Sequence, residues 1–106
     1  MELTVKKACE LYKKFTEESD GTVHPIRKYF NLPDCDYCVR ISHKIWGKIQ
    51  LIASYSQGLV HKSKMPALAE MELKQLNTML AALEKVDIKG IHNELKKLDL
   101  IFETTH

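Results

Sequence analysis

The sequence of 106 residues has few of the features that define several large protein classes. Its three cysteines are too few for a disulfide framework, so we expect reduced thiols in a cytoplasmic protein. Three prolines and four glycines exclude collagenous and low-complexity chains. No apolar run approaches the roughly 20 residues of a membrane span, and the first residues lack the basic-then-apolar order of a signal peptide. The sequence therefore predicts one soluble domain over residues 1–106.

The sequence also has little that points to catalysis. Its four glycines are scattered along the chain, so none of them forms a phosphate-binding glycine loop. Cys35 and His43 could form a nucleophile pair, but the sequence shows neither a third group to orient the imidazole nor an oxyanion site. Asp36 is better explained by the positive end of a helix dipole. We therefore expect a protein without enzymatic activity and without a small-molecule substrate.

Apolar residues recur at helical spacing along most of the chain, and no segment alternates with the period of a strand. This pattern predicts main helices over about 3–19, 34–60, 66–85 and 88–103. Between the first two, His24 and Pro25 resemble a helix start, and Pro33 ends the segment soon afterwards. Short connections make consecutive helices neighbours. The predicted fold is all-α, an up-and-down antiparallel bundle of four main helices with a short extra helix between the first and second.

Positive charge is concentrated in the middle of the sequence. Residues 22–64 carry seven Lys and Arg against two acidic residues, whereas the segments on either side are slightly acidic. Cations recur one turn apart on the second main helix, with a histidine beside them, at Arg40, His43, Lys44 and Lys48. A one-sided basic helix can bind nucleic acid through its phosphates or contact an acidic protein. The alternative is that this face is the solvated side of an amphipathic helix.

The second and third main helices carry more apolar surface than a thin bundle hides. Trp46 widens the apolar face of the second, and a leucine row that includes Leu73 and Leu76 runs along the third. Surface of this kind often packs against another copy or another protein. We therefore expect a protein partner or a homo-oligomer, with a small protein-binding adaptor or inhibitor as an alternative function. The other interpretation is that the first and fourth helices cover both sides.

Thiol and imidazole groups near the start of the second main helix resemble part of a zinc site. Cys35 and Cys38 have the Cys-x-x-Cys spacing, with His43 after them and His24 before them. On a continuous helix, Cys35 and His43 lie about 12 Å apart along the axis, too far to share one ion. We therefore expect structural thiols and no metal or cofactor. A zinc-stabilised helical domain remains an alternative that requires the start of this helix to unwind.

The order of elements is similar to that of a known family. A first amphipathic helix is followed by an aromatic and proline linker over 29–33, a long helix with Arg40 and Ile41, a helix rich in leucine and alanine, and a short last helix. This layout resembles the four-helix-bundle proteins encoded in ribosomal RNA intervening sequences and their relatives, the accessory proteins of diversity-generating retroelements. The resemblance implies a ring-like homo-oligomer whose basic surface meets nucleic acid and, in the retroelement branch, a reverse transcriptase. Arg40, Lys44 and Lys48 are the cations available for that surface. The expected function is thus a non-enzymatic binding or assembly module.

Overall fold

The computed structural model describes residues 2–19, 21–32, 36–58 and 64–84. Within these ranges the chain forms helices and their connections, with no strand. The helices in chain order are α1 Val5–Glu17, α2 His24–Tyr29, α3 Asp36–Gln57 and α4 Pro66–Glu84. They pack together, which confirms the all-α prediction. Across the part of the chain that is described, no helix is both long enough and apolar enough to cross a bilayer.

The first three predicted main helices and the short extra helix all occur in the structure. The predicted segments 3–19, 34–60 and 66–85 correspond to α1, α3 and α4, and α4 begins at the predicted residue Pro66. The short extra helix is α2. The helix predicted over 88–103 lies outside the described residues.

Residues at the helix ends explain where the helices begin and stop. The Thr4 hydroxyl accepts a hydrogen bond of 3.1 Å from the backbone N–H of Lys7, which caps the start of α1. Pro25 and Pro66 lie in the first turns of α2 and α4, where a missing N–H costs nothing. Gly58 directly follows α3 with φ of 72°, a left-handed conformation that glycine adopts without strain. Local sequence thus fixes these boundaries.

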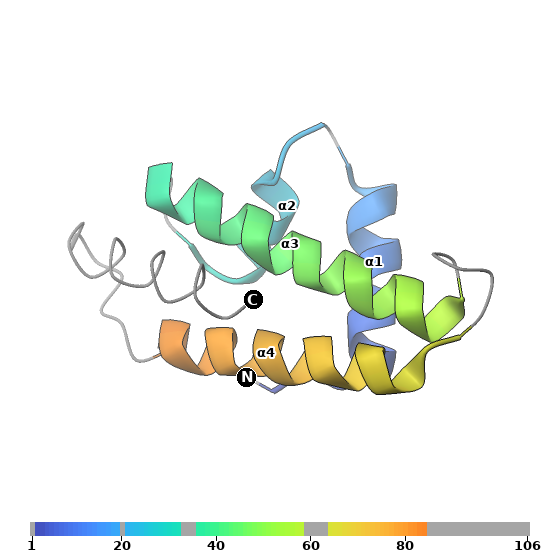
Figure 1. The fold of residues 1–106 in the computed structure, drawn as a ribbon. Helices are drawn as coiled ribbons and strands as arrows, with labels where there is room; N and C mark the ends of the chain where they lie inside the picture. The colour runs from blue at the N-terminus through green and yellow to red at the C-terminus, as the bar shows by residue number, and fades with distance from the viewer. Residues whose placement is uncertain (1, 20, 33–35, 59–63, 85–106) are drawn as a thin grey trace.

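The third helix is the centre of the packing. α3 and α4 lie side by side and run in opposite directions, while α1 crosses them steeply and α2 sits against α3 (Figure 1). The largest completely buried side chains of the described chain are Leu11, Ile41, Ile45, Ile49, Ile52, Leu76 and Met79. Four of these seven are isoleucines of α3, because α3 contacts each of the other three helices. One side of α3 is therefore packed against the other described helices, and its remaining side faces solvent.

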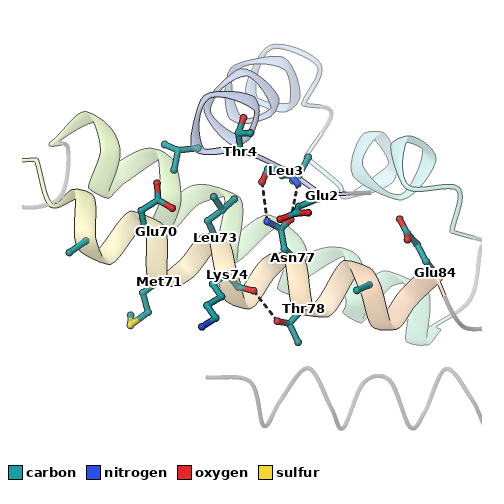
Figure 2. Close-up of a pocket in the computed structure, with 13 residues that line it drawn as sticks. Glu2, Leu3, Thr4, Glu70, Met71, Leu73, Lys74, Asn77, Thr78 and Glu84 are labelled. Atoms are coloured by element: carbon teal, nitrogen blue, oxygen red, sulfur yellow. Dashed lines mark hydrogen bonds between the residues drawn. The ribbon is translucent and has the colours of Figure 1, made fainter.

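A pair of hydrogen bonds attaches the N-terminal residues to α4. The backbone N–H of Leu3 donates to Oδ1 of Asn77 at 2.7 Å, and Nδ2 of Asn77 donates to the Leu3 carbonyl at 2.9 Å (Figure 2). One amide side chain thus satisfies both backbone groups of Leu3, as a neighbouring strand would. The Leu3 side chain is 4% exposed. We call this contact the N-terminal clasp.

Candidate functional site

The solvent-facing side of α3 is the candidate site. Its apolar residues recur every three or four positions, so the helix has one buried side and one side that the other helices leave uncovered. We define the outer face of α3 by its exposed and half-buried residues Arg40, His43, Lys44, Gly47, Gln50, Leu51 and Ser54. Leu51 is 36% exposed, a high value for a large apolar side chain. The outer face therefore combines cations at one end with uncharged and apolar groups at the other.

The ammonium group of Lys48 does not lie on this outer face, although the sequence pattern places Lys48 in the row of cations. Its ammonium group lies 2.7 Å from a carboxylate oxygen of Glu72 and also donates to the side chain of Gln75. The side chains of Lys48 and Glu72 are only 4% and 11% exposed. The charge of Lys48 is therefore neutralised between α3 and α4, and the predicted basic face has one cation fewer.

The other members of the predicted basic face are close together on α3. Arg40 and His43 are exposed and Lys44 is half-buried. The guanidinium carbon of Arg40 lies 6.0 Å from the centroid of the Tyr37 ring, within the range of a cation–π contact. Asp36, in the first turn of the same helix, is also exposed. Counting only described residues, the basic end of the outer face thus holds two permanent cations, one histidine and one nearby acid.

Of the three residues predicted to contact a partner, two lie in the core. Leu76 is completely buried and Leu73 is 8% exposed, so both pack inside the described chain. Trp46 is half-buried and packs against the edge of the core. Only Trp46 therefore has surface that a partner could touch.

The candidate zinc ligands are not brought together where they can be observed. Cys38 is completely buried, whereas His43, five residues later on the same helix, is exposed. His24 is exposed on α2, where its Nδ1 lies 3.3 Å from a guanidinium nitrogen of Arg27. Among the described residues no three His, Cys, Asp or Glu side chains cluster as a metal site would require. Cys35 lies outside them, so the zinc interpretation stays a prediction.

A small pocket opens between α1, α2 and α3, beside the outer face. Its volume is about 320 Å³, and we call it the aromatic pocket; it is lined by Tyr12, Phe15, Thr16, Ser19, Thr22, Pro25, Ile26, Trp46 and Gln50. The rings of Tyr12 and Trp46 are stacked, with centroids 5.6 Å apart and planes 12° apart. Phe15 meets Trp46 edge-on at 6.1 Å. Within the described part of the chain, the pocket lining carries no charged residue.

Sequence reasoning missed the aromatic pocket. Tyr12 and Phe15 belong to the apolar row of the first helix, which indicates only that they face a neighbour. The pocket is formed jointly by residues of α1, α2 and α3, an arrangement that no spacing within one segment encodes. The signal in the sequence was a single tryptophan on a helix that already had a full isoleucine row.

A second depression crosses the middle of the outer face. It has a volume of about 340 Å³ and is lined by Lys44, Gly47, Lys48, Gln50, Leu51 and Ser54. Gln50 also lines the aromatic pocket, so the two hollows share a wall. A Cβ placed on Gly47 would meet no heavy atom within 4 Å beyond its own helix turn and chain neighbours. Because Gly47 has no side chain, the depression reaches closer to the backbone of α3 at this point.

A wider groove runs along α4, between its solvent side and the N-terminal residues (Figure 2). Its volume is about 1130 Å³, and the labelled Met71 and Lys74 side chains point away from Leu3. Met71 is 46% exposed. The groove also contains Glu70, so acidic, basic and apolar groups alternate along it without converging on one point. This surface indicates no particular ligand chemistry.

Comparisons with known proteins identify no relative of this chain. No protein-family model matches it, no curated protein matches it, and no solved structure matches its fold. The outer face of α3 and the two hollows beside it are therefore the features that indicate a function.

Proposed function

We propose that the chain is a non-enzymatic protein-binding module whose outer face of α3 contacts an acidic partner. The observation that carries the proposal is the open space above Gly47, a glycine in the interior of the long helix α3. Glycine in a helix interior costs about 1 kcal/mol relative to alanine. A Cβ at this position would meet no side chain within 4 Å, so alanine would fit here. We attribute this loss of helix stability to the close approach of a partner at Gly47.

The charges beside Gly47 favour an acidic partner. Arg40 and Lys44 lie two turns and one turn before it on the same side of α3, and the exposed His43 lies beside them. Leu51 lies one turn after it and offers apolar contact. Interfaces typically combine an apolar centre with a polar rim that selects the partner by charge. The outer face of α3 has this composition on a small scale.

Its charge is too small for tight binding to a nucleic acid. Two permanent cations predict a loss of only about sevenfold in affinity for single strands between 50 and 200 mM salt, whereas six or more phosphate contacts lose about a thousandfold. Lys48, which would be a third cation, is paired with Glu72. Asp36 further reduces the positive charge of this helix end. An acidic protein surface with some apolar area fits the outer face better.

The proposal also includes the architecture of the module. The opposite directions of α3 and α4 support the antiparallel part of the predicted bundle, whereas α1, which crosses both steeply, departs from a strict up-and-down arrangement. In the bundle that we propose, the segment predicted over 88–103 supplies a fourth main helix. In such a bundle the outer face of α3 remains at the surface while its isoleucine row faces the centre.

Selection of peptides from a random library displayed on phage tests the proposed function. We expect the enriched peptides to be rich in Asp and Glu. A synthetic enriched peptide should bind the double variant Arg40→Glu/Lys44→Glu at least tenfold more weakly than the unmodified protein. The matched control is Lys6→Glu/Lys13→Glu, which makes the same change of charge at exposed positions of α1. Circular dichroism checks that both variants stay folded.

Three outcomes would overturn this proposal. The first is a failure to enrich any peptide. The second is an equal loss of affinity in the α1 control, which would show that only net charge matters. The third is tighter binding of polyuridine RNA than of every peptide, which would assign the outer face to nucleic acid.

A further inference from the structure

We infer that the aromatic pocket receives one planar aromatic side chain from the partner segment that lies on the outer face of α3. The inference deepens the proposed function and rests on it, because it names the group by which the partner is anchored. Aromatic side chains in pockets dominate the energetics of many protein interfaces. The pocket's walls, size and position each support this assignment.

The walls of the pocket suit an uncharged aromatic group. None of the described residues that line the pocket is charged, so they offer a carboxylate or an ammonium group no opposite charge. Tyr12 and Trp46 stack against each other, and Phe15 meets Trp46 edge-on. Because the first two rings are nearly parallel and in contact, they do not form the facing walls of a cation cage. A third ring can extend this cluster at the centroid separations of 4.5–7 Å that aromatic pairs prefer.

The size of the pocket limits what can enter it. Its volume of about 320 Å³ lies at the lower end of the range for small-molecule sites, so it accommodates a side chain rather than a large cofactor. Thr16, Ser19 and Gln50 supply polar atoms among the lining residues. The Thr16 hydroxyl donates to the Tyr12 carbonyl at 2.7 Å, and its oxygen can still accept a hydrogen bond. This polarity fits the phenol of a tyrosine or the backbone next to the inserted ring.

The position of the pocket links it to the basic end of the outer face. Gln50 forms part of the aromatic pocket and of the depression over Gly47, and Lys44 lines that depression but not the pocket. An α-helix with its side chains is about 10 Å across, which about three residues of extended chain can span. A partner segment anchored in the pocket can therefore cross α3 over Gly47. It would place an acidic residue near Lys44, roughly three positions from the aromatic residue.

Binding of small probes to the pocket tests the inference. We would titrate the ¹⁵N-labelled protein with N-acetyltyrosinamide, N-acetylleucinamide and adenosine, and follow amide and indole resonances by NMR. Trp46 is the only tryptophan of the chain, so its indole signal reports directly on the pocket. We expect N-acetyltyrosinamide to shift Trp46, Thr16 and Ser19, and to bind at least fivefold more tightly than N-acetylleucinamide.

Two variants with the same substitution show whether the probe enters the pocket. Gln50→Phe places a ring at the rim and should lower the affinity for N-acetyltyrosinamide at least tenfold. Gln57→Phe adds the same ring at an exposed position at the end of α3, outside the pocket, and should leave the affinity unchanged. The variant Arg40→Glu/Lys44→Glu should also retain probe binding, because neither residue lines the pocket.

The results separate this inference from the proposed function. Absence of shifts at Trp46, equal binding of the leucine probe, or equal losses in both glutamine variants would overturn the inference. Tighter binding of adenosine would overturn it in favour of a nucleobase. If the tyrosine probe binds as expected but no phage peptide depends on Arg40 and Lys44, the proposed function fails and the pocket remains an aromatic site.

Discussion

Nζ of Lys48 lies 2.7 Å from a carboxylate oxygen of Glu72, between two helices that leave these side chains 4% and 11% exposed. Lys48 belongs to α3 and Glu72 to α4, and Gln75 of α4 accepts a further hydrogen bond from the same ammonium group. A buried pair of this kind contributes little net stability but becomes costly when one partner is removed. It therefore fixes how α3 and α4 align along their length.

Replacing one member of this pair should destabilise the protein strongly. Lys48→Met leaves the Glu72 carboxylate buried without its partner, and we expect a loss of about 3 kcal/mol in the free energy of unfolding, measured by urea denaturation. The double variant Lys48→Met/Glu72→Leu should recover most of that loss, because both charges are gone. Lys13→Met, at an exposed position, is the control and should change stability by less than about 0.5 kcal/mol. Equal stability of Lys48→Met and the unmodified protein would contradict the buried pair.

Two glycine substitutions should have opposite effects on stability. At Gly47, inside α3, alanine removes a helix penalty, so Gly47→Ala should raise stability by about 1 kcal/mol and the melting temperature by about 4–8 °C. At Gly21 the backbone has φ of 84°, so Gly21→Ala introduces strain and should lower the melting temperature. A Cβ would meet nothing within 4 Å at either glycine, so steric crowding does not distinguish the two positions.

The same Gly47→Ala variant tests the proposed surface. Although it is more stable, it should bind a selected acidic peptide several-fold more weakly, because its methyl group raises the floor of the depression over α3. A stabilised variant with undiminished binding would show that the glycine has no part in recognition.

Removal of the N-terminal clasp should loosen only the beginning of the chain. In Asn77→Ala the Leu3 N–H loses its acceptor, so its amide should exchange with deuterium at least tenfold faster while core amides of α3 stay protected. Thr78→Ala is the control, because the Thr78 hydroxyl bonds only within α4, to the Lys74 carbonyl at 3.0 Å. Faster exchange of Leu3 in the control variant would argue against a specific role of Asn77.

The exposed pair of Lys14 and Glu18 should stabilise the protein slightly and lose this effect at high pH, where Lys14 loses its charge. A hydrogen bond of 2.7 Å from Lys14 to Glu18, and the charge of that carboxylate, raise the pKa of Lys14 above 10.5. The small stabilisation is therefore complete below pH 10.5 and is lost as the pH rises through the folded-state pKa. A ¹³C NMR titration of the lysine Cε atoms should show this raised pKa, and Glu18→Gln should lower it. An identical pKa for Lys14 in Glu18→Gln would contradict the pair.

Much of the helical layout could be predicted because it is encoded locally. The periodic apolar residues, Pro25 at the start of α2 and Pro66 at the start of α4 are all visible within short windows of sequence. The steep crossing of α1 over α3 and α4 could not be predicted in this way, because it depends on how side chains from separate helices fit together (Figure 1).

The candidate site was only partly predictable, and Lys48 shows why. Residues four apart on a helix differ by about 40° in direction, so a row with this spacing turns by about 80° from Arg40 to Lys48. That turn takes Lys48 from the outer face into the interface with α4, where Glu72 is its partner. Similarly, Leu73 and Leu76 belong to an apolar row that the neighbouring helices cover. Periodicity identifies which side of a helix is apolar, but packing decides how much of that side reaches the surface.

The N-terminal clasp also has a consequence for the order of folding. Its hydrogen bonds join residues 74 positions apart, whereas Lys48 and Glu72 are 24 positions apart. Closing the longer loop costs about 1 kcal/mol more chain entropy than closing the shorter one. The hairpin of α3 and α4 should therefore assemble first, and Leu3 should dock onto it late. The first residues of the chain are thus the last part to gain a partner and, on unfolding, the first to lose one.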